Sequence, residues 1–185
     1  MYETDLIPAF PPAELRTLRR IEELWQDGWY RPWGLFDGGR PVGECFMCLG
    51  DPGWLVLDYL CIAPCLRNRG LGAQLLKMMW KKEAGSVVIG ECEAPVHAEN
   101  PALAQRRLDF YMRNGARMAG YDVDYYGVHY KTFYWADGNV CDEELIARHR
   151  IIHRHSTAPG KYEKYILIPR DPDMPPIEGL DADDD

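Results

Sequence analysis

The stretch of sequence that decides the fold is WLVLDYLCIAPCLRNRGLG, residues 54–72. Its first half, Trp54 to Ile62, is nearly all apolar, which is typical of a strand in a sheet covered on both faces. Pro64 ends the strand because proline cannot donate to the ladder. Leucines and methionines then recur at helical spacing over residues 71–83. The stretch therefore predicts a strand, a glycine-rich loop and a helix in direct succession.

The loop between that strand and that helix has the character of an anion site. Gly70 and Gly72 carry no Cβ, so the backbone can approach a ligand closely. The first N–H groups of the helix point into the loop, and the helix dipole adds positive potential. Arg67 and Arg69 supply formal positive charge. This pattern favours a diphosphate ligand, and a tight turn with exposed arginines is the alternative interpretation.

The rest of the chain alternates helices and strands around this unit. Helical spacing predicts a first helix that Pro11-Pro12 opens and Gly28 closes, and further helices over residues 101–114 and 142–153. Apolar and aromatic alternation predicts strands over residues 33–36, 41–49, 86–93, 116–126, 131–135 and 162–168. This order indicates an α/β fold with a mixed sheet (α+β in its strand directions) and helices on its faces. We expect one domain over residues 1–170 and an acidic, disordered tail over residues 171–185.

Composition and charge exclude several classes of function. The chain carries 21 basic and 29 acidic residues, a net charge of −8, which argues against nucleic acid as a partner. No run of about 20 apolar residues exists, so we expect no membrane span. The first residues are acidic and lack the apolar core of an export signal, which favours the cytoplasm. The sequence leaves open whether the chain forms a homodimer.

Four cysteines have spacings that a zinc site could use. They are Cys45, Cys48, Cys61 and Cys65. The first two lie three residues apart in an expected strand, so they should face opposite sides of the sheet. Free cysteine is also among the most buried residue types. We therefore expect these cysteines to be core residues and not metal ligands.

Three histidines near residue 150 raise the same question. His149 and His153 share one face of an expected helix, with His155 close by. Arginines at positions 148, 150 and 154 surround them, and nearby cations disfavour a bound cation. We therefore expect a solvated helix face here and no metal site.

Three segments together resemble a known family. LCIAP at residues 60–64, followed by Arg67-x-x-Gly70-x-Gly72, resembles the signature of the GNAT superfamily of N-acetyltransferases. FYMRNG at residues 110–115 is similar to the family's Tyr-x-x-x-Gly segment. IGECE at residues 89–93 resembles the strand that carries an acidic residue near the acceptor. The resemblance covers about residues 10–135 and implies a three-layer fold with a central, mostly antiparallel, splayed sheet and helices on both faces.

The resemblance also implies acetyl-CoA as co-substrate and a set of residues that bind it. The loop amides would hold the diphosphate, and the strand before the loop would pair with the pantetheine arm. A bulge in that strand would splay it from its neighbour and open a slot for the thioester. A backbone N–H there could hold the developing oxyanion. The implied cofactor-binding residues are Leu60, Cys61, Ile62, Arg67, Asn68, Arg69, Gly70, Leu71, Gly72 and Ala73.

Acetyl transfer to an amine needs a base and an acid. An alkylamine has a pKa of about 10.4 and arrives protonated. Glu91 and Glu93 lie two apart on one strand and share a face, so either could accept the proton. We prefer Glu91, which matches the family's acidic position, and hold Glu93 in reserve. By the same resemblance, Tyr111 would protonate the thiolate in a direct transfer within a ternary complex. The alternatives are two exposed strand acids and a core aromatic residue.

The sequence does not identify the acceptor. Six aromatic residues between positions 120 and 134, with Trp29 and Trp33, would suit a small amine through cation–π contact, and a sheet core explains them equally well. A small-molecule amine is our first expectation. A protein N-terminus or a lysine is the second. A non-catalytic acyl-CoA sensor is a third, since it would keep residues 67–72 and need neither Glu91 nor Tyr111.

Overall fold

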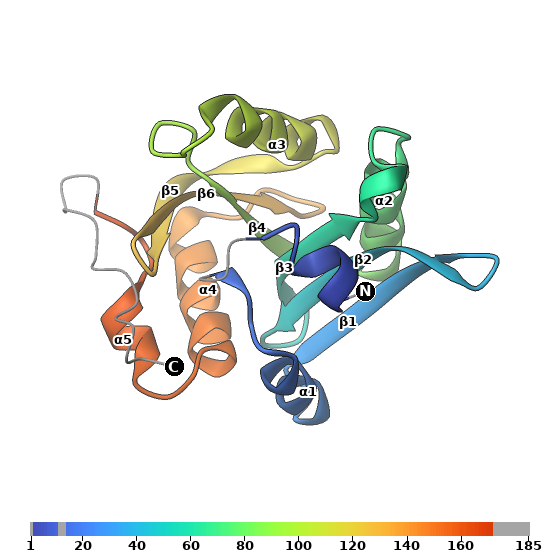
Figure 1. The fold of residues 1–185 in the computed structure, drawn as a ribbon. Helices are drawn as coiled ribbons and strands as arrows, with labels where there is room; N and C mark the ends of the chain where they lie inside the picture. Colours follow the sequence, from blue (N-terminus) through green and yellow to red (C-terminus); the bar gives the residue numbers. More distant parts are fainter. Residues whose placement is uncertain (1, 11–13, 172–185) are drawn as a thin grey trace.

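The computed structural model describes residues 2–10 and 14–171, and its strands form one mixed sheet (Figure 1). The strand order is β1-β2-β3-β4-β6-β5-β7. Only the pair β3–β4 is parallel among these strands, and the other neighbours are antiparallel. The strands are β1 (Tyr30–Asp37), β2 (Arg40–Leu49), β3 (Trp54–Ile62), β4 (Val87–Glu93), β5 (Arg117–Tyr125), β6 (Val128–Trp135) and β7 (Ile166–Leu167).

Helices cover both faces of this sheet. One core cluster joins the sheet to α1 (Leu18–Gln26) and α4 (Asp142–Ser156). A second cluster, on the other face, joins it to α2 (Leu71–Lys82) and α3 (Pro101–Arg113). The short elements are η1 (Tyr2–Leu6), η3 (Pro64–Leu66) and α5 (Lys161–Tyr165). The predicted three layers are therefore confirmed. None of the described helices is both long enough and apolar enough to cross a membrane.

The sheet splays between β3 and β4, as predicted. Strand β3 pairs with β4 only up to the partners Leu57 and Gly90. Opposite β2, the register jumps so that Phe46 faces Tyr59 and Met47 faces Leu57, which leaves Asp58 as a bulge. Beyond it, the end of β3 is paired on one side only, by β2, and the end of β4 only by β6. Figure 1 shows the two strands diverging.

A partly buried ion pair holds the bulge in place. Arg16 donates from Nε to Asp58 Oδ2 at 2.9 Å and from Nη1 to the Ser156 carbonyl at 2.8 Å. Tyr30 donates its hydroxyl hydrogen to the same carboxylate. Burial would lower the pKa of Arg16, but Asp58, together with Cys48, Tyr59 and Tyr30, outweighs burial and raises that pKa well above its ordinary value. The bulge is thus tied to the chain before α1 and to the end of α4.

Two predicted elements are wrong at their ends. Helix α1 begins at Leu18, later than the start predicted at Pro11-Pro12, because Thr17 caps it by accepting from the Arg20 N–H at 3.2 Å. The strand expected over residues 162–168 is mostly the helix α5, followed by the short β7. Tyr162 and Tyr165 are both buried. Residues three apart share a face in a helix but not in a strand, so a helical turn buries both.

The remaining elements lie where they were predicted, although β1, β6 and α4 are each three or four residues longer. The hairpin β1–β2 turns through Gly38 and Gly39, both with positive φ. Asn100 caps α3 by accepting from the Leu103 N–H, and Pro101 is the first helical residue. The tail predicted over residues 171–185 lies, apart from its first residue, outside the described residues.

Strand β2 buries one carboxyl group without a partner. Glu44 is fully buried, and among the described residues neither of its oxygens has a hydrogen-bond partner. Burial raises the pKa of Glu44 to about 7, and the charge of Asp5 adds to the effect. The folded state therefore binds the proton more tightly than the unfolded chain, whose glutamate pKa is about 4.3.

This carboxyl group should make the stability of the protein pH-dependent. Between the unfolded and folded pKa values the folded state holds more protons, so the free energy of unfolding falls as pH rises from about 4.3 to 7. In the wild type, the free energy of unfolding should fall by on the order of 2 kcal/mol between pH 5 and pH 8. We expect Glu44→Gln to remove this fall, as measured by urea unfolding. The exposed Glu22→Gln is the matched control. An unchanged pH dependence in Glu44→Gln contradicts the prediction.

Candidate active site

The loop after β3 folds as an anion site should. Asn68 and Gly70 have φ values of 62° and 80°, so the chain reverses into α2 within a few residues. Gly70 is the N-cap of α2, and no side chain caps that end. The first N–H groups of a helix have no partner within the helix. The amides of Leu71, Gly72 and Ala73 are therefore placed to bind an external anion.

The arginines near this loop are used differently from the prediction. Arg67 folds back and donates from Nε to the Ile62 carbonyl at 3.1 Å, so it caps the end of β3. Arg106 of α3, which the sequence reasoning missed, donates to Asn68 Oδ1 at 2.6 Å. Residues 106 and 110 lie one helical turn apart, so the face that carries Phe110 also carries Arg106. That spacing is the signal that could have identified Arg106.

Gly72 allows a close approach, as predicted, but to a side chain of the protein. A Cβ at this position would lie 3.2 Å from Cζ of Phe110 and 3.9 Å from Cγ1 of Ile62. The missing side chain thus lets Phe110 of α3 pack closely against the start of α2 and the end of β3.

One cavity of about 1330 Å³ connects these features. It runs from the loop, along the end of β3 on the side that β4 leaves open, to the end of β4 and to β5 and β6. All the predicted cofactor-binding residues line it except Arg69, which is exposed. The predicted catalytic residues Glu91, Glu93 and Tyr111 line it as well. The structure therefore brings together residues that three separate segments of the sequence supply.

Tyr111 projects from α3 on the α2/α3 side of the sheet. Its ring stacks on Phe133, with 4.6 Å between the centroids. Burial raises the pKa of Tyr111, and the thiols of Cys92 and Cys45 add to the shift. The phenol therefore stays protonated at neutral pH and can donate a hydrogen bond or a proton.

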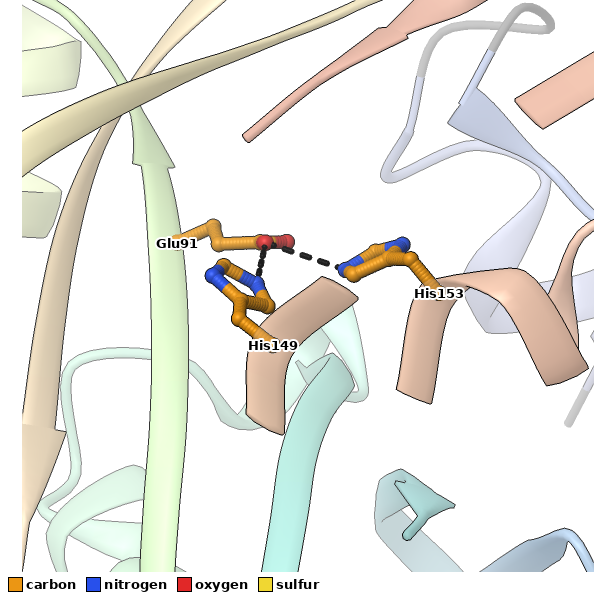
Figure 2. A group of neighbouring side chains, drawn as sticks. All are labelled: Glu91, His149 and His153. Atoms are coloured by element: carbon orange, nitrogen blue, oxygen red, sulfur yellow. Dashed lines mark hydrogen bonds and ion pairs between the residues drawn. The ribbon is translucent and has the colours of Figure 1, made fainter. Parts of the chain in front are cut away.

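Glu91 lies on the α1/α4 side of the sheet, in a cluster that the sequence reasoning missed (Figure 2). Its Oε1 atom lies 2.5 Å from His149 Nε2 and 3.2 Å from His153 Nε2. Tyr125 donates its hydroxyl hydrogen to the same oxygen. The prediction of a solvated helix face is wrong, because His149 is 0% and His153 5% exposed.

The arginines that led to that prediction point away from the cluster. Arg148 pairs with Asp51, Arg150 donates to the Ile168 carbonyl, and Arg154 lies over the ring of Tyr162. The buried face of α4 has helical spacing and consists of Leu145, His149, Ile152, His153 and Ser156. That stripe, and not the residues adjacent in sequence, is the signal that could have placed the histidines correctly.

The surroundings of Glu91 keep it ionised. Burial would raise its pKa, but the two imidazoles, by charge and hydrogen bonding, lower it well below the usual range. For His149, burial outweighs the carboxylate and lowers the pKa of the imidazole. A carboxylate of such low basicity is a weak acceptor for the proton of an amine.

Two further carboxyl groups line the cavity. Glu93 lies two residues beyond Glu91 on the same face of β4, as predicted. Glu14, which sequence reasoning missed, lies in the segment before α1 and hydrogen-bonds Tyr130. Burial raises the pKa of Glu14, and the charges of Glu93 and Glu91 add to the shift. Three carboxyl groups therefore interact in this part of the cavity, and the charge of Arg107 opposes the shift at Glu14.

The aromatic residues between positions 120 and 134 divide between the cavity wall and the sheet core, the two roles that the sequence left open. Tyr125, Tyr126 and Tyr130 line the cavity. The other three belong to the core, with Phe133 on the α2/α3 side and Tyr121 and Tyr134 on the α1/α4 side. Trp29 lies against the ring of His155 and Trp33 lies beneath Lys82, both away from the described lining of the cavity.

The four cysteines considered for zinc do not converge. Cys45 lies in the core on the α2/α3 side, whereas Cys48 and Cys61 lie in the core on the other side. Cys65 is exposed. The opposite orientation predicted for Cys45 and Cys48 is confirmed.

Comparisons with known proteins agree with this architecture. The acetyltransferase (GNAT) family model matches residues 1–112. A Bacteroides thetaiotaomicron protein assigned to the GNAT acetyltransferases has a TM-score of 0.69 at 23% identity, covering 85% of this chain and 91% of that one. One from Desulfovibrio desulfuricans, assigned likewise, has a TM-score of 0.51 at 17% identity, covering 64% and 77%. An aminoglycoside 6'-N-acetyltransferase complexed with coenzyme A has 0.50 at 14% identity, covering 64% and 78%. Comparison with curated proteins finds no match.

The close contact between Gly72 and Phe110 gives a test of coenzyme A binding. A leucine at position 72 would crowd Phe110 and Ile62, which line the cavity beside the helix N-terminus. We expect Gly72→Leu to weaken CoA binding at least about tenfold, which corresponds to about 1.4 kcal/mol, measured by calorimetry. Gln74→Leu, on the exposed side of the same helical turn, should bind like the wild type. Equal affinity in all three proteins would rule out this site for the coenzyme.

Proposed function

The chain belongs to the acetyltransferase (GNAT) family, and from that premise we propose that it transfers an acetyl group from acetyl-CoA to a primary amine of a small molecule. One observation carries the proposal. A single cavity is lined by the uncapped N-terminus of α2, the end of β3 that no longer pairs with β4, Tyr111, and the carboxylates of β4. Anion binding, thioester placement and proton transfer therefore share one space.

In this proposal the coenzyme lies along the loop and β3. Its diphosphate accepts hydrogen bonds from the amides at residues 71–73, where the helix dipole is favourable. Its pantetheine arm pairs with the backbone of Leu60, Cys61 and Ile62, on the side that β4 no longer occupies. An N–H group on that side of β3 can then hold the oxyanion that develops on the thioester carbonyl.

We assign the base role to Glu93 in preference to Glu91. The sequence favours Glu91, but its Oε1 is engaged by two imidazoles and a phenol, which lowers its pKa and its basicity. Glu93 shares the face and lines the same cavity. With Glu14 nearby, it also forms an acidic subsite that attracts a cationic amine.

The transfer then proceeds directly in a ternary complex. Glu93 takes a proton from the ammonium group, and the free amine nitrogen attacks the thioester carbonyl carbon. The C–N bond forms, the C–S bond breaks, and the leaving thiolate takes the proton of Tyr111. The nitrogen loses its second proton as it becomes an amide, and that proton restores the phenol, because the raised pKa of Tyr111 disfavours a lasting phenolate. The amide and CoA leave, and no acetyl group is attached to the protein.

The acceptor is proposed to be small because of the walls of the cavity. Tyr125, Tyr126 and Tyr130 line it beside the carboxylates, and aromatic faces attract cations. A protein N-terminus or lysine side chain is the second candidate, since either would present the same ammonium group. A non-catalytic acyl-CoA sensor would use the α2 end of the cavity alone.

An acetylation screen tests the function. We expect thiol release from acetyl-CoA with at least one amine among polyamines, amino acids, aminoglycosides and peptides, measured with a thiol-reactive dye. Mass spectrometry of the acceptor should show one added acetyl group. CoA binding by calorimetry with no acetylation of any class would establish the sensor instead, and the absence of CoA binding would remove both.

The base assignment gives a separate test. We expect Glu93→Gln to lower kcat by about 10²-fold at neutral pH, because the ammonium group then loses its proton acceptor. The KM for acetyl-CoA should stay unchanged. The exposed Glu99→Gln, in the connection after β4, is the matched control. Wild-type kcat in Glu93→Gln across the pH range would refute this role.

A further inference from the structure

The cluster around Glu91 contains more polar atoms than the acetyl transfer uses. The Nε2 atoms of His149 and His153 both point at one carboxylate oxygen of Glu91 (Figure 2). The hydroxyl of Tyr125 lies 3.2 Å from each of those nitrogens. The three ligand-type atoms of Glu91, His149 and His153 all lie within 4.8 Å of one another. Two imidazoles and a carboxylate thus meet at one buried point.

We propose that Glu91, His149 and His153 form a site for a divalent transition-metal ion, with Zn²⁺ as the first candidate. Two imidazole nitrogens and one carboxylate oxygen are a donor set that binds zinc and leaves a position open. The histidines are four residues apart on α4, so one helix face presents both side chains to the same point. The third donor comes from β4, which fixes the site between two elements.

The two distances from Glu91 Oε1 to the histidine Nε2 atoms suit such an ion after one adjustment. Bonds of about 2.0–2.1 Å in a tetrahedral site place neighbouring ligand atoms about 3.3 Å apart. His153 Nε2 and Glu91 Oε1 are 3.2 Å apart, close to that spacing. His149 Nε2 and Glu91 Oε1 are 2.5 Å apart and have to separate by about 0.8 Å. Rotation of the Glu91 side chain, which is 14% exposed toward the cavity, provides that movement.

The surroundings of the cluster also fit a bound cation. His149 Nδ1 is hydrogen-bonded to the Tyr121 hydroxyl at 3.0 Å, and such a second bond orients a metal-binding imidazole. Each of the three α4 arginines is occupied elsewhere. A buried carboxylate needs a compensating positive charge. A divalent ion would supply it at the point where the three donors meet.

The position of the site suggests what it would bind. Glu91, His153 and Tyr125 line the large cavity, so a fourth coordination position faces the acceptor side. An acceptor with an oxygen or nitrogen donor atom near its amine could occupy that position and be oriented there. The site itself does not depend on acetyl transfer, because its donors lie apart from Tyr111, Glu93 and the coenzyme loop.

Metal content of the full-length chain tests the proposal. The protein is prepared without a polyhistidine tag, stripped with chelator, incubated with Zn²⁺ and desalted, and bound metal is measured by mass spectrometry. We expect about one Zn²⁺ per chain in the wild type. His153→Ala and Glu91→Gln should weaken binding at least about tenfold, because each removes one of three donors. His155→Ala, on the same helix but outside the cluster, should keep the metal.

Two further measurements separate the outcomes. The double variant Cys65→Ser with Cys141→Ser removes the exposed thiols. Loss of bound zinc in this variant would mean that the thiols held the zinc, and that result overturns the proposal. Co²⁺ added to the stripped wild type should give visible d–d absorption of a four-coordinate ion, so the test stands even where a variant fails to fold. Absence of both bound zinc and this absorption also overturns it, and leaves a hydrogen-bonded network around Glu91. CoA calorimetry on the stripped protein judges the proposed enzyme separately.

Discussion

The ion pair between Arg16 and Asp58 is the interaction on which the rest of the site depends. Asp58 is the bulge that ends the pairing of β3 with β4, so it determines where the sheet opens. Arg16 is partly buried, and it holds this carboxylate while also donating to the carbonyl of Ser156 at the end of α4. A pair of this kind contributes modestly to stability but fixes geometry, because either charge alone would be costly where water is largely excluded. The slot therefore has a defined position relative to α4 and its histidines.

That opening also brings together chemistry from opposite faces of the sheet. Tyr111 and the N-terminus of α2 lie on the side of α2 and α3, whereas Glu91 and Glu93 face α1 and α4. In a continuous sheet the backbone would separate them. Where β3 and β4 diverge, the cavity passes between the strands, so a thioester can lie between an acid on one side and a base on the other. The antiparallel pairs at either side keep this gap rigid.

The sequence predicted those parts of the structure that local rules determine. Strand β3, the glycine loop and α2 follow one another directly, and their spacing and turn residues specify them. Arg106 and Glu14 were missed because their roles depend on contacts with residues about 40 and more than 100 positions away in the chain. The histidines were misplaced because adjacent arginines were given more weight than residues three and four apart, which are the neighbours on a helix. The arginines next to the histidines in sequence therefore do not determine the charge around the histidines in the structure.

The roles of the carboxylates of β4 are linked by this geometry. The two imidazoles and the phenol all contact one oxygen of Glu91, and the imidazoles lower the pKa of this carboxyl group, so it is a weak acceptor for an ammonium proton. The same arrangement suits a carboxylate that binds a cation, whether that cation is a metal ion or a protonated imidazole. Glu93, one pleat further along the strand and outside that cluster, is then the carboxylate left to accept a proton. Glu91 and Glu93 share one face of β4, but the histidines of α4 contact only Glu91. The helix therefore assigns cation binding to Glu91 and leaves proton transfer to Glu93.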